Sequence, residues 1–205
     1  MPVGLARDLL DLTLEHLFLV GLSIMIAATL AIPTGILLTR RVPLQRWVLG
    51  FANIMQTVPS LALFGFLIPI PFLGGIGKHT AIVALVLYAL LPILRNTLTG
   101  ILSVDPAVRE SAIAMGMTGR QLLWEVELQL AARTILAGLR IATVTTIGTA
   151  TIAAAIGGGG LGVFIFRGLA SVDTTLLLAG AVPAALIALG ADRGLEWVEN
   201  KLSPL

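Results

Sequence analysis

The stretch of sequence that decides the fold is residues 103–129, SVDPAVRESAIAMGMTGRQLLWEVELQ. It is the least hydrophobic stretch between the apolar runs of the chain, and it carries four acidic residues and two arginines among good helix formers. This composition predicts a helical segment that faces water. Asp105 can cap a helix whose first residue is Pro106, and Gly116 is suited to end that helix in a left-handed conformation.

A second helix is predicted directly after Gly116. Thr118 and Gln121 have the spacing of a capping box, in which each residue binds a backbone N–H of the other's turn. The apolar residues of this helix are Leu122, Leu123 and Val126. The glutamates of the segment, expected on a solvated helix face, are Glu110, Glu125 and Glu127. The segment therefore predicts two short helices that meet at a glycine elbow.

Long apolar runs flank this segment on both sides. The chain has 205 residues, of which 57% are hydrophobic and 12% are charged, about half the charged share of an ordinary soluble domain. A transmembrane helix needs about 20 apolar residues, and the runs that meet this length lie at about 12–38, 47–72, 80–102, 130–156 and 174–190. We therefore predict an all-α integral membrane protein with about five transmembrane helices in a single domain, residues 1–205. Whether residues 163–170 add a sixth span stays open.

The second run contains features that an ordinary membrane helix lacks. Pro59 removes a backbone donor and is expected to kink or break the helix. Gln56 places an amide deep in the span, where it needs either a partner or a hydrated cavity. Gln56, Thr57 and Pro59 are therefore candidates to line a translocation pathway. Arg95 and Asn96, near the end of the third run, are interpreted as anchors at the membrane interface.

The fourth run is rich in alanine, glycine and threonine, which permits close contact between helices. Thr145 and Thr149 are candidate pathway residues on this helix. The small-residue face of the run, together with the glycines that follow at 157–162, is a candidate contact with a second copy of the chain. Arg133 and Arg140 lie at the start of this run, so the membrane entry is expected near Gly138 and the preceding turns at the interface, where arginine can snorkel.

The distribution of lysine and arginine predicts the orientation. Positively charged loops stay in the cytoplasm, and the loop after the first run, the segment 103–129 and the C-terminal tail hold the larger share of these residues. The N-terminus is therefore predicted outside and the C-terminus in the cytoplasm.

The residues that catalysis would need are missing. Cysteine is absent and there are two histidines, too few ligands for a catalytic zinc, and no other metal site is evident. The glycines at 157–162 match a dinucleotide fingerprint in spacing but lie between membrane segments, where the motif's strand is missing. No basic patch suggests nucleic acid as a partner. We expect no catalytic residues, although a small intramembrane enzyme or a membrane scaffold remains an alternative of a different class.

The water-facing segment resembles the signature of permease subunits of ABC importers: E-A-A, three residues, G, nine residues, I-x-L-P. The residues at the signature positions are Glu110, Ser111, Ala112, Gly116, Val126 and Leu128, and their spacing matches without a gap. Ser111 replaces the first alanine, and Gln129 stands where the signature has proline, so the turn ending the loop is expected to be less rigid. Further runs resemble the branch that transports glycine betaine, carnitine and choline: 56–62 (QTVPSLA), 136–142 (LAGLRIA) and 156–162 (IGGGGLG).

The resemblance implies a type I importer permease in a bacterial or archaeal plasma (inner) membrane. In such importers the loop forms coupling helices that dock on a cytoplasmic ATPase dimer, which binds ATP and Mg; no cofactor is expected in this chain. The implied coupling residues are Glu110, Ser111, Ala112, Ile113, Met115, Gly116, Met117 and Arg120. The apolar contacts are expected from Ala112, Ile113, Met115 and Met117, with Glu110 and Arg120 at the periphery.

The other implied partners are a second permease subunit, identical or homologous, an extracytoplasmic substrate-binding protein and membrane lipid. The implied substrate is an osmoprotectant of the glycine betaine, choline or carnitine type. The spans show no evident aromatic cage for a quaternary ammonium group. Recognition is therefore expected to rest with the binding protein. Because the coupling signature is shared across many substrates, an importer of amino acids or another small polar solute remains the alternative within transport.

Overall fold

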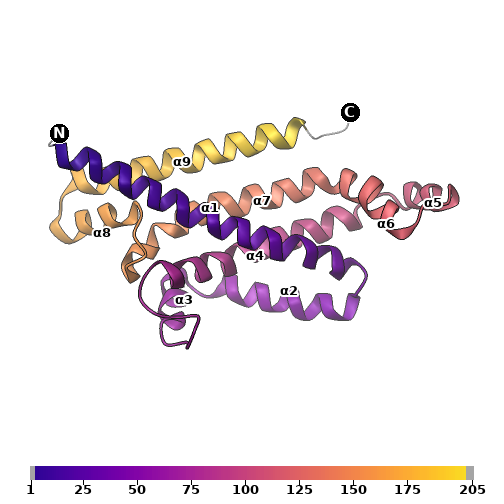
Figure 1. Ribbon diagram of the computed structural model, residues 1–205, viewed down its shortest axis with the longest axis horizontal. Helices are drawn as coiled ribbons and strands as arrows, with labels where there is room; N and C mark the ends of the chain where they lie inside the picture. The colour runs from indigo at the N-terminus through magenta and orange to yellow at the C-terminus, as the bar shows by residue number, and fades with distance from the viewer. Residues whose placement is uncertain (1–2, 202–205) are drawn as a thin grey trace.

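The computed structural model describes residues 3–201 and is helical throughout, with no strand among these residues. The long helices are α1 (Val3–Thr39), α4 (Lys78–Leu102), α7 (Leu128–Ala150) and α9 (Thr174–Lys201). They lie along one long axis (Figure 1). Among the described residues, 4 helices are long and apolar enough to cross a membrane. They are α1, α4, α9, and α7 counted together with the short helical segments that lead into it from Gly119. Residues 1–2 and 202–205 of the predicted domain lie outside the described part.

The fifth span is a broken one. α2 (Val42–Thr57) and α3 (Ser60–Leu67) meet at an angle of 105°. The break follows from Pro59, which has no N–H to donate and which forces the residue before it out of the helical region. Val58 is accordingly extended, with φ −67° and ψ 127°. Counted as one span, the pair confirms the predicted total of about five.

The bundle is organised around α4, whose most apolar window is 61% buried, against 11% for α9. Small residues bring the helices next to it very close. An ideal Cβ built on Gly138 of α7 would lie 2.5 Å from the Cβ of Asn96 and 2.8 Å from the carbonyl of Pro92. An ideal Cβ built on Gly100 of α4 would lie 3.2 Å from the Cβ of Ala131 in α7. Glycines are therefore required where α4 and α7 cross, as the composition of the fourth run predicts.

The glycine run ends the fourth span as predicted. A short 3-10 helix, η2 (Ile152–Ile156), follows α7, and Gly157 then takes the left-handed conformation with φ 75°. α8 (Gly162–Ser171) follows and packs against α9. Its ten residues are about 15 Å long, half the thickness of the hydrocarbon core. Its length therefore does not suffice for a sixth span by itself.

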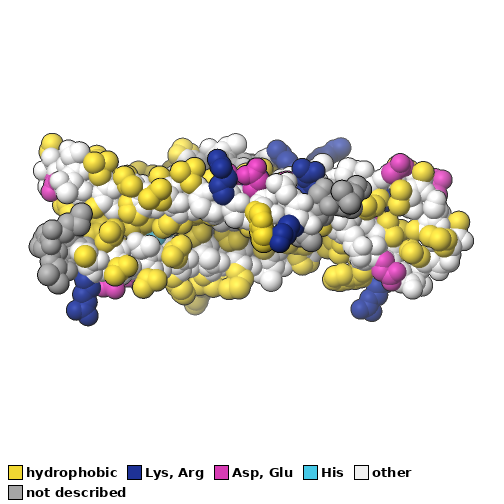
Figure 2. All heavy atoms as spheres, turned by 90° about the horizontal axis from the view of Figure 1, so that it is seen from above, with side chains coloured by type: hydrophobic (Ala, Val, Ile, Leu, Met, Phe, Trp, Pro, Cys, Tyr) yellow, Lys and Arg dark blue, Asp and Glu magenta, His cyan; other side chains and the backbone are white. Residues whose placement is uncertain are grey.

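α9 extends eleven residues beyond the predicted span, since residues 191–201, expected as a polar tail, belong to the same helix. Polar residues of this extension hold it against α7. The Nε of Arg140 lies 3.2 Å from Oδ1 of Asp192, and its Nη1 lies 3.3 Å from Oε2 of Glu199. In Figure 2, charged side chains interrupt an otherwise largely apolar flank. Arg140 is thus paired with two carboxylates of α9.

Candidate coupling site and pathway face

The predicted elbow lies at one end of the bundle, opposite the N-terminus (Figure 1). Its first helix is α5 (Pro106–Ala114), and Oδ1 of Asp105 accepts a hydrogen bond of 2.8 Å from the N–H of Ala107. The helix ends in a Schellman motif: Gly116 N–H donates to the Ile113 carbonyl at 2.9 Å and Met117 N–H to the Ala112 carbonyl at 3.2 Å. Gly116 has φ 86°, so both the cap and the left-handed stop are confirmed.

The second helix begins as predicted but does not end as predicted. The capping box between Thr118 and Gln121 is present. However, α6 (Gly119–Gln121) continues through a π-helical turn, η1 (Leu122–Glu127), directly into α7. The prediction of a turn near Gln129 is therefore wrong. Glutamine keeps the backbone N–H that a proline would lack, so the helix continues through this position.

Most of the predicted coupling residues are open to solvent. Glu110, Ser111, Gly116 and Arg120 are exposed, and the exposed fractions of Ile113 and Met115 are 58% and 72%. Ala112 is only 2% exposed, so the expectation that it forms part of the presented apolar surface is wrong. Met117 is half-buried. Ala112 and Met117 occupy the positions that pack against each other in a Schellman motif, which explains why both are drawn inward.

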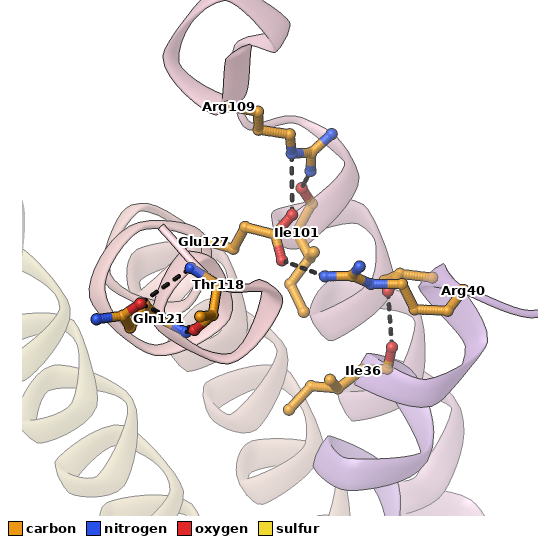
Figure 3. Close-up of polar contacts among 8 residues, drawn as sticks. Ile36, Arg40, Ile101, Arg109, Thr118, Gln121 and Glu127 are labelled. Atoms are coloured by element: carbon orange, nitrogen blue, oxygen red, sulfur yellow. Dashed lines mark hydrogen bonds and ion pairs between the residues drawn. The ribbon is translucent and has the colours of Figure 1, made fainter. Parts of the chain in front are cut away.

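A buried carboxylate lies beneath the elbow, at a position predicted to be solvated. Glu127 is 5% exposed. Its Oε1 lies 3.0 Å from Nε of Arg109 in α5, and its Oε2 lies 3.4 Å from Nη2 of Arg40, which follows α1 (Figure 3). Arg109 also donates a hydrogen bond from Nη2 to the Ile101 carbonyl near the end of α4. Glu127 therefore joins the elbow to the membrane helices.

The π-helical turn explains why periodicity alone places Glu127 on the wrong face. A π turn adds one residue to an α-helix and rotates the following residues by about 100° about its axis. Leu122 and Glu127 are buried, whereas Glu125 is exposed. The apolar pattern of Leu122, Leu123 and Val126 contains no signal of this insertion. A buried acid needs a paired base, but the segment 103–129 holds four acidic residues and two arginines, so its composition does not single out Glu127 as the paired one.

The predicted pathway residues of the second span lie around the break between α2 and α3. Gln56 donates from Nε2 to the Tyr88 carbonyl of α4 at 3.1 Å, and the Tyr88 hydroxyl donates to the Val58 carbonyl. The amide therefore has a partner, as a polar group in a span requires. The Thr57 hydroxyl is bonded to the Ile54 carbonyl of its own helix at 2.8 Å. Gln56, Thr57 and Pro59 are all exposed in the single chain.

The same face of α4 carries a charge that the sequence interpretation assigned to membrane anchoring. Arg95 is exposed and donates from Nη2 to Oδ1 of Asn53 in α2 at 2.8 Å. No carboxylate lies within ion-pairing distance of Arg95 among residues 3–201. Polar side chains of α2 and α4 thus lie along the contact between these two helices, with Gln56 and Arg95 exposed and Asn53 half-buried.

The predicted threonines of α7 are available from outside the bundle. Thr145 is exposed, and Thr149 is half-buried. Their hydroxyls donate to carbonyls one turn earlier, at 2.8 Å for Thr145 to Ile141 and 2.9 Å for Thr149 to Thr145. Gly148 is exposed too, and a Cβ there would meet nothing within 4 Å. The small-residue face is therefore divided: Gly138 packs inside the chain, and Thr145 and Gly148 remain uncovered.

At the opposite end an ion pair holds the glycine run. Nζ of Lys78, the first residue of α4, lies 2.8 Å from Oε1 of Glu15 in α1. Oε2 of Glu15 accepts a hydrogen bond of 3.2 Å from Gly160 N–H. Gly159 and Gly160 both have positive φ, at 82° and 74°. The run 157–162 therefore approaches α1 closely, and a Cβ built on Gly159 would lie 2.5 Å from Oε2 of Glu15.

Comparison with known proteins agrees with this architecture. The sequence profile of the family "Binding-protein-dependent transport system inner membrane component" matches residues 31–204. The carnitine transport permease protein OpuCB of Listeria monocytogenes is 45% identical over 97% of this chain and 89% of the relative. The glycine betaine/carnitine/choline transport system permease protein OpuCD of Bacillus subtilis is 46% identical over 93% and 82%. The osmoprotectant import permease protein OsmW of Salmonella typhimurium is 42% identical over 97% and 94%.

Solved structures show the same fold. A chain of the MetNI methionine ABC transporter, described as inward facing, superposes with a TM-score of 0.88 over 100% of both chains at 24% identity. A chain of an amino acid ABC transporter crystallised with histidines gives a TM-score of 0.79 over 97% and 96% at 18% identity. These likenesses confirm the predicted all-α importer permease fold. On its sequence profile, its relatives and its fold, this chain belongs to the family of binding-protein-dependent transport system inner membrane components.

Proposed function

We propose that the chain is a permease subunit of an ATP-driven importer that passes a small osmoprotectant of the glycine betaine, choline or carnitine type into the cytoplasm. The observation that carries this proposal is the exposed, glycine-bent elbow at one end of a membrane-spanning bundle. Curated relatives at 42–46% identity, named for osmoprotectant, carnitine and choline transport, support the substrate class. Transporters of amino acids share only the fold, which supports the alternative substrate less strongly.

The elbow docks on a cytoplasmic ATPase dimer that holds ATP and Mg. Ile113 and Met115 supply an apolar contact, and Glu110, Ser111 and Arg120 surround it with polar groups. Gly116 sets the shape of the elbow, while Ala112 and Met117 support it from within. Closure of the ATPase dimer moves the two elbows of a permease pair toward each other and rocks the spans. The chain itself performs no catalysis in this proposal.

The polar side of the bundle faces the pathway, and the apolar flanks face lipid. Exposed polar groups are costly in hydrocarbon, and in membrane proteins they mark water-filled routes and subunit contacts. The pathway residues are Gln56, Thr57, Pro59, Thr145 and Thr149, and the structure adds Asn53 and Arg95. A single chain with five spans lines half of a pathway, so a second permease completes it. An extracytoplasmic binding protein supplies the substrate.

The orientation follows from the docking partner. With the elbow in the cytoplasm of a bacterial cell, five spans place the N-terminus outside the inner membrane and the C-terminus inside. A reporter enzyme that is active only in the periplasm, fused after Leu205, is expected to be inactive. An active fusion would contradict this orientation.

Co-purification and uptake together test the function. We expect the affinity-purified permease to bring a cytoplasmic ATPase with it. The complex, reconstituted in liposomes with its binding protein, is expected to import radiolabelled glycine betaine, carnitine or choline only when ATP is supplied. Uptake of an amino acid in place of these three would establish the alternative. Uptake without ATP, or purification without an ATPase, would refute the importer.

A further inference from the structure

We propose that Glu127 is the positioning residue that transmits movement of the coupling elbow to the membrane helices. This inference rests on the proposed function, because it assumes that an ATPase moves the elbow. It concerns a residue that lies outside the docking surface and outside the pathway. Its role follows from which elements meet at its carboxylate.

The two oxygens of Glu127 contact two different parts of the chain. Oε1 lies 3.0 Å from Nε of Arg109 in α5, an ion pair without a hydrogen bond, and Oε2 accepts a hydrogen bond from Nη2 of Arg40, directly after α1. Because Arg109 also holds the Ile101 carbonyl, the end of α4 is tied to the same cluster. Figure 3 shows the three charged side chains converging from separate elements. A displacement of α5 therefore acts on α1, α4 and α7 at one point.

Burial makes this junction stiff. The side chain of Glu127 is 6% exposed and that of Arg109 is 24% exposed, whereas that of Arg40 is 56% exposed. A charge pair screened from water cannot exchange its partner for solvent without a large penalty, unlike a surface pair. Arg109 and Glu127 are therefore expected to move together, with Arg40 as the more easily released member.

The π-helical turn places the carboxylate of Glu127 in the junction. The extra residue in η1 directs Glu127 inward, and π turns are common at functional sites. Past this turn, α7 runs without a break to Ala150. Movement of α5 is thus passed through Glu127 into a helix that carries Thr145. Removal of the charge should leave the docking surface intact but loosen the link behind it.

The chain offers a closely matched control. Glu125 lies in the same π turn, is exposed, and forms no ion pair among the residues that the structure describes. Glu127→Gln removes a buried, paired charge, whereas Glu125→Gln removes a solvated one. Glu127→Asp retains the charge on a shorter side chain and should restore part of the coupling.

The experiment measures uptake and ATP hydrolysis in the same proteoliposomes, with the complete complex and its binding protein. For Glu127→Gln we expect the ATPase to co-purify normally, and the number of substrate molecules imported per ATP to fall at least about fivefold, the lower end of typical coupling between distant sites. Glu125→Gln is expected to keep the wild-type ratio. A purely structural role would reduce the amount of folded complex without changing this ratio.

A double-mutant cycle then tests the pair itself. If Arg109 and Glu127 act as one unit, Arg109→Gln combined with Glu127→Gln should lower the ratio no further than either single change. A ratio within twofold of wild type for Glu127→Gln would overturn the inference, and so would additive losses in the cycle. Either result leaves the proposed function standing, whereas a wild-type complex that imports nothing would refute the proposed function instead.

Discussion

Replacement of Gly116 tests whether the shape of the elbow is required for transport. The residue has φ +86°, and a Cβ there would meet no atom within 4 Å. A side chain at this position therefore encounters open space, and its cost comes from the backbone alone. That cost is about 1–2 kcal/mol for an L-residue in the left-handed region. Such an energy lowers the population of the native elbow about 5- to 30-fold relative to competing conformations.

The expected order of transport activity is Gly, then Asn, then Ala, then Val. Asparagine tolerates the left-handed region, alanine does so poorly, and a β-branched residue is a strong outlier there. Gly119→Ala is the matched control, because Gly119 is also exposed and unobstructed but has no positive φ. At such a position alanine is neutral or stabilises by up to about 1 kcal/mol.

The assay is ATP-driven uptake in proteoliposomes, normalised to the amount of inserted permease measured by quantitative blotting. We expect Gly116→Val to insert normally and to lose most uptake, while ATP hydrolysis by the bound ATPase persists without productive transport. Wild-type uptake by Gly116→Val would refute the argument from backbone strain. Equal losses in Gly116→Val and Gly119→Ala would show that the loop tolerates no change and that strain is not the cause.

Further changes test the packing, the broken span and the permease pair. Gly138→Leu should force α4 and α7 apart at Asn96 and cost about 1–3 kcal/mol or more of overpacking, which lowers the melting temperature in detergent. Gly148→Ala, at an unobstructed position of the same helix, should leave the melting temperature unchanged or raise it. Tyr88→Phe leaves the Val58 carbonyl without its hydroxyl partner and should lower stability by about 0.5–1.5 kcal/mol, measured by thermal denaturation. Gly148→Cys should crosslink two copies of the permease if this uncovered position lies at their contact, and the 205 residues of the chain contain no other cysteine that could react. An active complex that shows no crosslink would contradict that contact.

Local sequence signals predicted the elbow well because each acts over a few residues. Asp105 before Pro106, Gly116 after the helix, and the pair Thr118 and Gln121 are all satisfied by backbone groups within three residues. The break at Pro59 is equally local, since the ring itself removes the donor. Such features depend little on tertiary context, which is why they could be predicted before the fold was known.

Features that depend on distant partners could not be predicted in this way. Glu127 pairs with an arginine 87 positions away, and no periodicity links the two. Ala112 was expected to face a partner because it belongs to the family signature, yet the packing of the cap draws it inward. Arg140 was interpreted only through its place near the membrane interface, whereas α9 supplies two carboxylates that pair with it. In each case the burial of a side chain was decided by an element far along the chain.

Gln129 stands where the importer signature has proline, and this difference has a mechanical consequence. Because no proline interrupts the chain there, the helix that starts at Gly119 continues to Ala150 as one element of 32 residues, about 48 Å long at 1.5 Å per residue. A force applied at the elbow therefore reaches Thr145 along a continuous helix and reaches α1 through Glu127. With a proline at 129 the ring would clash with the carbonyl of Glu125 and remove one backbone hydrogen bond, so the π turn and a kink would be adjacent. Gln129→Pro should therefore weaken the transmission of force along α7 and leave the contact of Glu127 with Arg40, directly after α1, in place.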